Sequence, residues 1–365
     1  MLRPAMGVAA LFWLLAACVC GYRESHGDAQ LAMAELDGNI LTEAGAAVDT
    51  PEWLATLIAD GTILTSTILG AIYTPKTRLA KGLPLVAIGE TVFIKNGSAA
   101  ASSIHATLLH RAGREDGGGE TVAQIWETAE DPFIYVVFQR ASGSTKYIEQ
   151  EMVDVDWEGS GQATAQVRIK SYEYYKCNKL WHTYGLGETL RGLAGKYPEK
   201  TILFTGQSRG ATMAEVAGFR YAVTARSDPN YRPPLIVSKG AYRWTNAAGR
   251  DLMSELLPNR FAHLLLSRVV HGTREYDFVS RVPGHAAGFV DMRPSFHIDV
   301  DLGAVGECAP SRGCPGTDVS FGEIWEATAN YKQLHKSICY IHSLKKSMAF
   351  GSEACDDAGG AGGGG

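Results

Sequence analysis

The chain has 365 residues, of which 45% are hydrophobic and 20% are charged, a composition typical of a folded globular protein rather than a disordered one. Its net charge of −5 and its isoelectric point near 6.1 argue against nucleic acid as a partner. The seven cysteines are too few for a disulfide scaffold, and no pair has the Cys-x-x-Cys spacing of a zinc site. We therefore expect no structural metal, and nothing in the sequence indicates a cofactor.

The first 21 residues have the pattern of a secretory signal peptide. A short basic start is followed by about ten apolar residues and then by small residues that suit a cleavage site. A buried N-terminal helix is the alternative. Residues 15–18 also resemble a bacterial lipoprotein box, in which Cys18 would carry a lipid. The sequence therefore predicts secretion, with membrane attachment through this segment or a lipidated Cys18 as the alternative.

Residues 22–118 are predicted to form a helical N-terminal extension. Apolar residues recur at helical spacing from residue 28 to about residue 110. Asp60 and Gly61 interrupt the longest apolar stretch, which argues against a transmembrane helix and favours helices packed on a core. The charged and glycine-rich loop 114–119 then predicts a domain boundary near residue 119.

Residues 119–347 have the pattern of an α/β domain. Two apolar runs, 122–126 and 133–138, predict a hairpin, and residues 184–196, 201–205 and 211–223 predict a helix, a buried strand and a second helix. The β-rich runs 235–237 and 264–270 add further strands. We expect a sheet with helices on its faces, followed by a disordered, glycine-rich tail over 348–365.

A candidate nucleophile lies between the predicted strand 201–205 and the following helix. Residues 206–210 match Gly-x-Ser-x-Gly, with Ser208 at the centre. In a nucleophile elbow, Gly206 and Gly210 omit side chains that would collide as the chain turns, so that Ser208 is held exposed in a strained turn. A plain turn-forming loop is the alternative for the pentapeptide alone.

A serine nucleophile needs a base and an orienting carboxylate, which in this kind of fold follow it in the order Ser, Asp, His. Asp277 lies just after an apolar strand, where the carboxylate belongs. A solvated loop carboxylate is the alternative interpretation of Asp277.

Four segments in matching order resemble the motifs of the class 3, or fungal lipase-type, lipase family. They are residues 138–142 (Phe-Arg-Gly-Ser/Thr in the family), 206–210 (Gly-His-Ser-Leu-Gly), 240–246 (Gly-x-Pro-Arg-x-Gly-Asn) and 277–283 (Asp-x-Val-Pro-x-x-Pro). The resemblance covers residues 119–347. It implies an α/β-hydrolase fold, with a mostly parallel central sheet flanked by helices, a catalytic triad and a mobile lid.

The resemblance also assigns roles to individual residues. It implies that Ser208 is the nucleophile and Asp277 the triad acid. Ser142 and the backbone N–H of Arg209 would then form the oxyanion hole. Ser142 also begins a Ser/Gly-rich loop, so a simple turn role is its alternative.

Three histidines that follow Asp277 are candidates for the base. We favour His335, because residues 334–340 resemble the family's catalytic histidine and the aromatic-containing helix after it. His297 better resembles a non-catalytic position, and His342 lies about two helical turns beyond His335. All three remain open at this point.

The chain departs from the family pattern at several positions. Gln207 replaces the usual histidine before the nucleophile, Arg209 replaces a small apolar residue, Ala211 replaces a glycine, and Tyr242 and Ser280 replace prolines. None of these changes removes a triad group. The Arg209 cation could stabilise negative charge at the oxyanion, bind an anionic head group, or form an ion pair at the rim of the elbow.

Residues 143–157 are the lid candidate. They alternate apolar and acidic side chains, which suits a segment that exposes its apolar face to a lipid–water interface, or an ordinary packed helix. Cys308 and Cys314 bracket a turn-forming segment and are candidates for a disulfide bond, with two free thiols as the alternative.

These patterns predict a serine ester hydrolase acting on lipid esters, namely a triacylglycerol lipase or a related acylglycerol lipase of lipid catabolism. The alternative is a catalytically weak or inactive lipase-like protein that binds lipid or another partner. The sequence specifies neither the acyl-chain length nor the oligomeric state.

Overall fold

The computed structural model describes residues 50–95, 103–113, 122–139, 150–158, 160, 164–270, 273–300, 305–308, 335, 339–341 and 343–344. All of these belong to one compact unit, Ala46–Gly365. The predicted signal segment, the tail, Ser142, Cys314 and His342 lie outside the described residues. The inferences drawn for them above, including the Cys308–Cys314 bond, therefore stay predictions.

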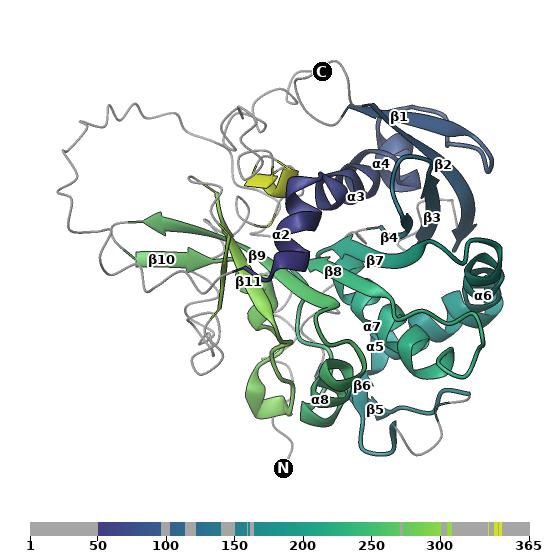
Figure 1. Cartoon of the computed structure of the whole chain (residues 1–365). Helices are drawn as coiled ribbons and strands as arrows, with labels where there is room; N and C mark the ends of the chain where they lie inside the picture. Colours follow the sequence, from purple (N-terminus) through teal and green to yellow (C-terminus); the bar gives the residue numbers. More distant parts are fainter. Residues whose placement is uncertain are drawn as a thin grey trace, which may run out of the picture. The chain divides into compact units, whose positions relative to one another are not determined.

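Within the described residues, ten strands form one sheet in the order β1-β2-β3-β4-β7-β8-β9-β11-β12, with β10 paired to β9 (Figure 1). The strands are β1 (Thr91–Lys95), β2 (Ser103–Ala112), β3 (Ala123–Thr128), β4 (Phe133–Phe138), β7 (Thr201–Gln207), β8 (Leu235–Lys239), β9 (Phe261–Val270), β10 (Thr273–Tyr276), β11 (Ser295–Asp299) and β12 (Val305–Glu307). The central strands β4, β7, β8, β9 and β11 are parallel, and antiparallel pairs flank them. The parallel centre confirms the predicted α/β-hydrolase class.

Helices cover both faces of the sheet (Figure 1). One face carries α5 (Ser171–Asn178), α6 (Leu186–Lys196), α7 (Arg209–Thr224) and α8 (Ala247–Leu256), and the other carries α2 (Glu52–Ala59) and α3 (Thr62–Ile72). Alternate side chains of β7 serve the two cores: Phe204 packs with the first group and Leu203 with the second. The predicted hairpin over β3 and β4 and the predicted strand and helix around Ser208 are present as expected.

The prediction of helix up to residue 110 is wrong for β1 and β2. In β1, Val92 and Ile94 are buried, whereas Phe93 between them is 66% exposed. This period-two alternation is that of a strand with one buried face, and it is short enough to be hidden in a longer apolar region. The strands pair with each other and extend the sheet.

The predicted boundary near residue 119 does not separate two units. Strand β2 pairs with β3 across it, and α3 packs against β4 and β7, with every residue from Thr62 to Leu69 buried. Each fully buried leucine or isoleucine in α3 contributes about 1.5–3 kcal/mol by leaving water. The described part of the predicted extension is therefore built into the α/β core.

No single helix in the described part of the chain is long and apolar enough to cross a membrane. Only α2 and α3 taken together meet that test, and they are bent by 59° at the break between them.

The described part of the lid candidate is not a helix. Strand β5 (Met152–Asp154) pairs with β6 (Arg168–Lys170), and the segment after β5 is anchored by Trp157, which is 2% exposed and packs on Phe219 at a ring distance of 5.6 Å. Residues 143–149 lie outside the described residues. A mobile lid remains a prediction, and only for the part that precedes this anchor.

A buried acid lies beneath the elbow helix and gives the fold a pH dependence. Glu215 of α7 is fully buried and accepts hydrogen bonds from Ser238 Oγ and Trp244 Nε1. Burial raises the pKa of Glu215 to about 8 from an ordinary 4.5, although the two hydrogen bonds oppose the shift. Between these pH values the Glu215 carboxyl is ionised in the unfolded chain and neutral in the folded chain. The contribution of Glu215 to the free energy of unfolding is therefore fully present below pH 4.5 and is lost as the pH rises towards 8.

We therefore expect Glu215→Gln to remove this pH dependence, because the amide cannot ionise yet can occupy the same hydrogen-bonding position. The free energy of unfolding of the wild type, relative to that of the variant, should fall by a few kcal/mol between pH 5 and pH 8. Urea denaturation at several pH values would measure it. A constant difference across this range would contradict a neutral Glu215.

Candidate active site

Ser208 lies at a sharp turn between β7 and α7, at the carboxyl end of the central sheet. Its backbone has φ 60° and ψ −130°, one of two positive φ values among the described non-glycine residues. The backbone N–H of Ser208 donates to the carbonyl of Lys239 at 2.9 Å, which ties the turn to the end of β8. A strained serine held this way matches the nucleophile elbow expected from the sequence.

Steric contacts explain why both Gly206 and Gly210 must be glycine. A Cβ on Gly206 would overlap the backbone of Gly210, and a Cβ on Gly210 would overlap the carbonyl oxygen of Phe138. Only glycine allows β7, α7 and the end of β4 to approach this closely.

The structure brings together Ser208, His335 and Asp277. His335 Nε2 lies 2.7 Å from Ser208 Oγ, and His335 Nδ1 lies 2.7 Å from Asp277 Oδ2. Asp277 and His335 are 1% and 3% exposed. In this chain of hydrogen bonds the imidazole can accept the serine proton at Nε2 while the carboxylate holds the proton on Nδ1.

Further hydrogen bonds fix Asp277. The backbone N–H of Val279 donates to Oδ1 at 3.2 Å, and the Tyr340 hydroxyl donates to Oδ2 at 3.1 Å. Ser280, one of the departures from the family pattern, donates from its hydroxyl to the Asp277 carbonyl at 2.8 Å. The carboxylate is thus oriented from both sides.

Gln207 fixes the backbone that carries the imidazole. The side-chain Nε2 of Gln207 donates to the backbone carbonyl of His335 at 2.7 Å, in a buried position. The residue that replaces the usual histidine before the nucleophile therefore fastens the segment that carries the base. The sequence singled out Gln207 as a departure but did not indicate this partner, 128 residues further along the chain.

His263 of β9 is a second buried histidine near Asp277. Burial lowers the pKa of His263 to about 4, and the charges of Asp277 and Asp291 oppose the shift only in part. His263 is therefore uncharged at neutral pH and does not compete with His335 for the negative charge of Asp277.

Gly240 leaves space for the acid and the base. Its φ is +60°, and a Cβ there would lie 2.6 Å from Asp277 Oδ2, 2.8 Å from the Tyr340 hydroxyl and 3.2 Å from His335 Cε1. Gly240 is the first residue of the motif segment 240–246, but only the structure shows that its missing side chain leaves room for three other groups.

We expect Gly240→Ala to lower kcat by about a hundredfold, because the added methyl group displaces the acid and the base from hydrogen-bonding geometry. Gly185→Ala is the matched control, since Gly185 has φ +68° and open space around its Cβ position. Both variants bear the same backbone strain of about 1–2 kcal/mol, but only the first should lose activity. Equal kcat values in the two folded variants would contradict the spatial role of Gly240.

The remaining predicted site residues are placed as follows. Arg209 is the first residue of α7, and its guanidinium carbon lies 4.2 Å from the centre of the Tyr172 ring. His297 lies on β11. Ser142 and His342 fall outside the described residues, so the oxyanion role of Ser142 stays a prediction.

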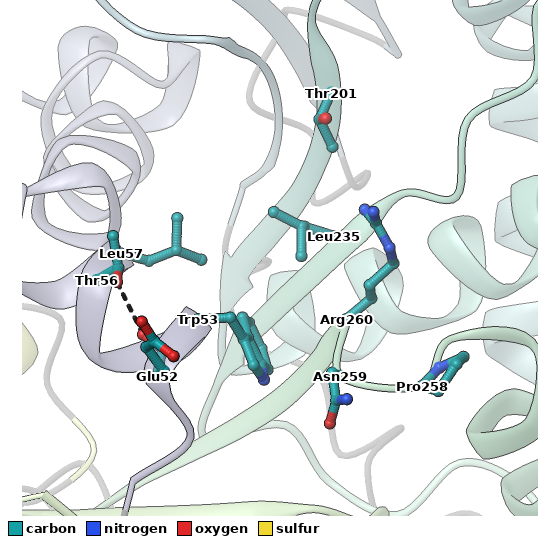
Figure 2. Close-up of a pocket in the computed structure, with 9 residues that line it drawn as sticks. All are labelled: Glu52, Trp53, Thr56, Leu57, Thr201, Leu235, Pro258, Asn259 and Arg260. Atoms are coloured by element: carbon teal, nitrogen blue, oxygen red, sulfur yellow. Dashed lines mark hydrogen bonds between the residues drawn. The ribbon is translucent and has the colours of Figure 1, made fainter.

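A separate pocket of about 640 Å³ opens at the other end of the sheet (Figure 2). Thr201 and Leu235 begin β7 and β8, Arg260 directly precedes β9, and Trp53 of α2 lies opposite them. These are amino ends of strands, whereas Ser208 follows a carboxyl end. The pocket is therefore not part of the Ser208 site.

One family model matches the part of the chain that contains Ser208 and Asp277. Residues 136–286 match the family model described as Lipase (class 3). No curated protein sequence matches the chain.

Solved structures share the fold at low sequence identity. A point mutant of MDLA from Penicillium cyclopium is 15% identical with a TM-score of 0.57, and the match covers 82% of this chain and 100% of that one. A triacylglycerol lipase from Penicillium expansum is 15% identical with a TM-score of 0.50, covering 72% of this chain and 87% of that one. At these identities the likeness shows the fold.

Proposed function

We propose that this chain cleaves lipid esters through Ser208, His335 and Asp277. It carries a class 3 lipase region of the α/β-hydrolase superfamily, which makes it a carboxylic ester hydrolase. The observation that carries the proposal is the pair of 2.7 Å hydrogen bonds on the two nitrogens of His335. They join a strained serine to a buried carboxylate through one imidazole.

The reaction starts when Ser208 Oγ bonds to the acyl carbon of the ester. The electron pair of the carbonyl π bond moves to the oxygen, and the serine proton passes to His335 Nε2. The oxyanion is stabilised by the backbone N–H of Arg209 at the start of α7 and, as the family resemblance implies, by Ser142. Asp277 holds the imidazolium in place.

The alcohol then leaves with the proton from His335, and an acyl-serine remains. A water molecule, deprotonated by the same imidazole, attacks the acyl carbon, and collapse of the second oxyanion returns the proton to Ser208 and releases the fatty acid. The two half-reactions balance as hydrolysis of one ester to an acid and an alcohol.

Covalent labelling tests the nucleophile. A fluorophosphonate probe should label the wild-type chain at Ser208 and should not label Ser208→Ala. A folded wild-type protein that is not labelled by the probe would contradict the proposed function.

The lipid substrate class needs a second measurement. Hydrolysis should be followed against acyl-chain length, below and above the concentration at which the ester aggregates. A rise in rate upon aggregation would support a lipid substrate and an interfacial role for residues 143–149. Lipid binding without cleavage at any chain length would favour the alternative, a lipase-like binding protein.

The compartment is also part of the proposal. We infer secretion from residues 1–21, with attachment through Cys18 as the alternative. Mass spectrometry of the mature N-terminus would distinguish a cleaved chain, a lipidated Cys18 and an uncleaved chain.

A further inference from the structure

Exposed apolar side chains are concentrated in one short stretch of the chain. Among the described residues six large hydrophobic side chains are exposed, and five of them lie between Ile72 and Phe93. The sixth, Tyr175, belongs to α5 on the opposite face of the sheet. Single exposed apolar residues are ordinary on a protein surface, whereas a group of them marks an interaction surface.

Three of the five side chains flank or end α4 (Pro75–Ala80), the short helix that follows α3 (Figure 1). Ile72, Leu79 and Leu83 are 41%, 46% and 43% exposed. The backbone N–H of Leu83 donates to the carbonyl of Arg78 at 2.8 Å, which folds the chain after α4 back onto the helix. The apolar side chains are therefore presented by a hydrogen-bonded turn of the chain.

The charges of this stretch have one sign. Between Asp60 and Glu90 the chain contains three basic residues and no acidic one. Each of these two flanking carboxylates accepts a hydrogen bond from a nearby backbone N–H. The Arg78 guanidinium lies 5.9 Å from the centre of the Tyr73 ring, and Lys81 is exposed. Neither cation forms an ion pair within the described part of the chain, so both charges are available to a partner. We call the following residues the α4 surface: Ile72, Arg78, Leu79, Lys81 and Leu83.

The α4 surface belongs to the edge of the sheet at which Ser208 is found. The backbone N–H of Lys76 in α4 donates to Gln139 Oε1 at 3.1 Å. Gln139 directly follows β4, whose last residue, Phe138, pairs with Gly206 near the end of β7. The helix α4 is thereby fixed at the carboxyl ends of two parallel strands, and one of these strands leads into the nucleophile elbow.

The chemistry of the α4 surface fits a lipid surface with anionic head groups. Exposed leucine and isoleucine side chains gain free energy when they enter the boundary between head groups and acyl chains, and neighbouring lysine and arginine remain with the anionic head groups. A second copy of the chain fits less well. A two-fold dimer through this surface would bring Arg78 and Lys81 towards the same cations of the other copy.

We propose that the α4 surface docks this chain on a lipid aggregate that contains anionic head groups, with the edge of the sheet that carries Ser208 turned towards the lipid. The inference extends the proposed function, on which it rests for the nature of the partner. The α4 surface lies outside the segment 136–286 that matches the family model, and it is separate from the lid candidate.

Flotation with lipid vesicles tests the docking in a full chain that carries Cys18→Ser and Ser208→Ala, here called the parent. The first change excludes a lipid anchor, and the second excludes hydrolysis of the vesicles. The vesicles consist of phosphatidylcholine, with or without phosphatidylglycerol. We expect the parent to bind the mixed vesicles, and we expect this binding to weaken as the salt concentration rises.

Two variants of the parent separate the apolar and the charged contribution. Leu79→Ser/Leu83→Ser should lower the partition coefficient on the mixed vesicles by about tenfold, because two apolar side chains no longer leave water. Arg78→Gln/Lys81→Gln should lower it by about tenfold to thirtyfold on the mixed vesicles and by less than about twofold on pure phosphatidylcholine. If the leucine variant does not fold, Ile72→Ser should show a loss of about threefold.

The matched controls remove the same kinds of side chain elsewhere. Tyr175→Ser removes the exposed hydrophobic residue of α5. Lys196→Gln/Arg226→Gln removes two exposed cations after α6 and α7, at the opposite edge of the sheet. Both controls should bind within about twofold of the parent. A parent that binds neither vesicle, α4-surface variants that bind like the parent, or controls that lose as much as these variants would overturn the proposal.

Two further measurements separate the proposal from its alternatives. In chains that keep Ser208, the α4-surface variants should hydrolyse p-nitrophenyl butyrate in solution within about twofold of the wild type. A chain that docks through the α4 surface but cleaves no ester would contradict the proposed function and leave the docking intact. Sedimentation velocity tests for a second copy: a dimer that dissociates in the α4-surface variants, with vesicle binding unchanged, would overturn the docking and leave the hydrolase function intact.

Discussion

His335→Ala is expected to lower kcat for ester hydrolysis by about 10⁵- to 10⁶-fold, because no other described group lies within hydrogen-bonding distance of Ser208 Oγ to take its proton. KM should change little, since the imidazole contributes to proton transfer rather than to binding of the acyl chain. Steady-state kinetics on a soluble ester, with circular dichroism to confirm folding, would measure both quantities.

The matched controls are the other two histidines that follow Asp277. His297 lies on β11, whereas the described hydrogen bond to Ser208 Oγ comes from His335, so His297→Ala should retain kcat within a few-fold. His342→Ala should also remain active if His335 is the base. A large loss in His342→Ala together with an active His335→Ala would transfer the role of base to His342.

Local patterns were sufficient to predict the elbow. A five-residue apolar run, two glycines around a serine and a helical pattern all lie between residues 201 and 223, and the structure forms β7, the strained turn and α7 there. Each signal depends on residues close together in the sequence. That is the condition under which periodicity and turn chemistry work best.

The edge of the sheet could not be predicted in the same way. Val92 and Ile94 alternate with exposed residues over only five positions, and what makes this segment a strand is pairing with residues 103–107 and, through them, with β3. Such partners are chosen by the tertiary structure, which overrides weak local preference. The predicted helical extension failed for this reason.

The residues that support the triad could not be predicted from the sequence either. The order Ser, Asp, His was visible, but the contact between Tyr340 and Asp277 spans 63 residues, and that between Gln207 and His335 spans 128. For Arg209 the sequence left three roles open, because nothing in it shows that the guanidinium points to α5. The family resemblance identified candidate residues, and the structure supplied their partners.

Asp277→Asn is expected to lower kcat by about 10⁴-fold while leaving the fold intact. Asp277 Oδ2 lies 2.7 Å from His335 Nδ1 and also accepts from the Tyr340 hydroxyl at 3.1 Å, so it stabilises the histidine tautomer with its proton on Nδ1. An asparagine that placed its amide nitrogen there would favour the opposite tautomer, whose protonated Nε2 cannot accept the serine proton. The loss should appear in kcat, measured as for His335→Ala.

Asp291→Asn provides the matched control for this prediction. Asp291 is also paired with a histidine, His285, at 3.2 Å, and with Arg243 at 2.6 Å, but it has no contact with Ser208 or His335. Its substitution should lower the free energy of unfolding by about 1–3 kcal/mol and leave kcat within a few-fold, because it disturbs a charged hydrogen bond outside the reaction path. An active Asp277→Asn would contradict this prediction, because it would mean that His335 keeps its proton on Nδ1 without the carboxylate.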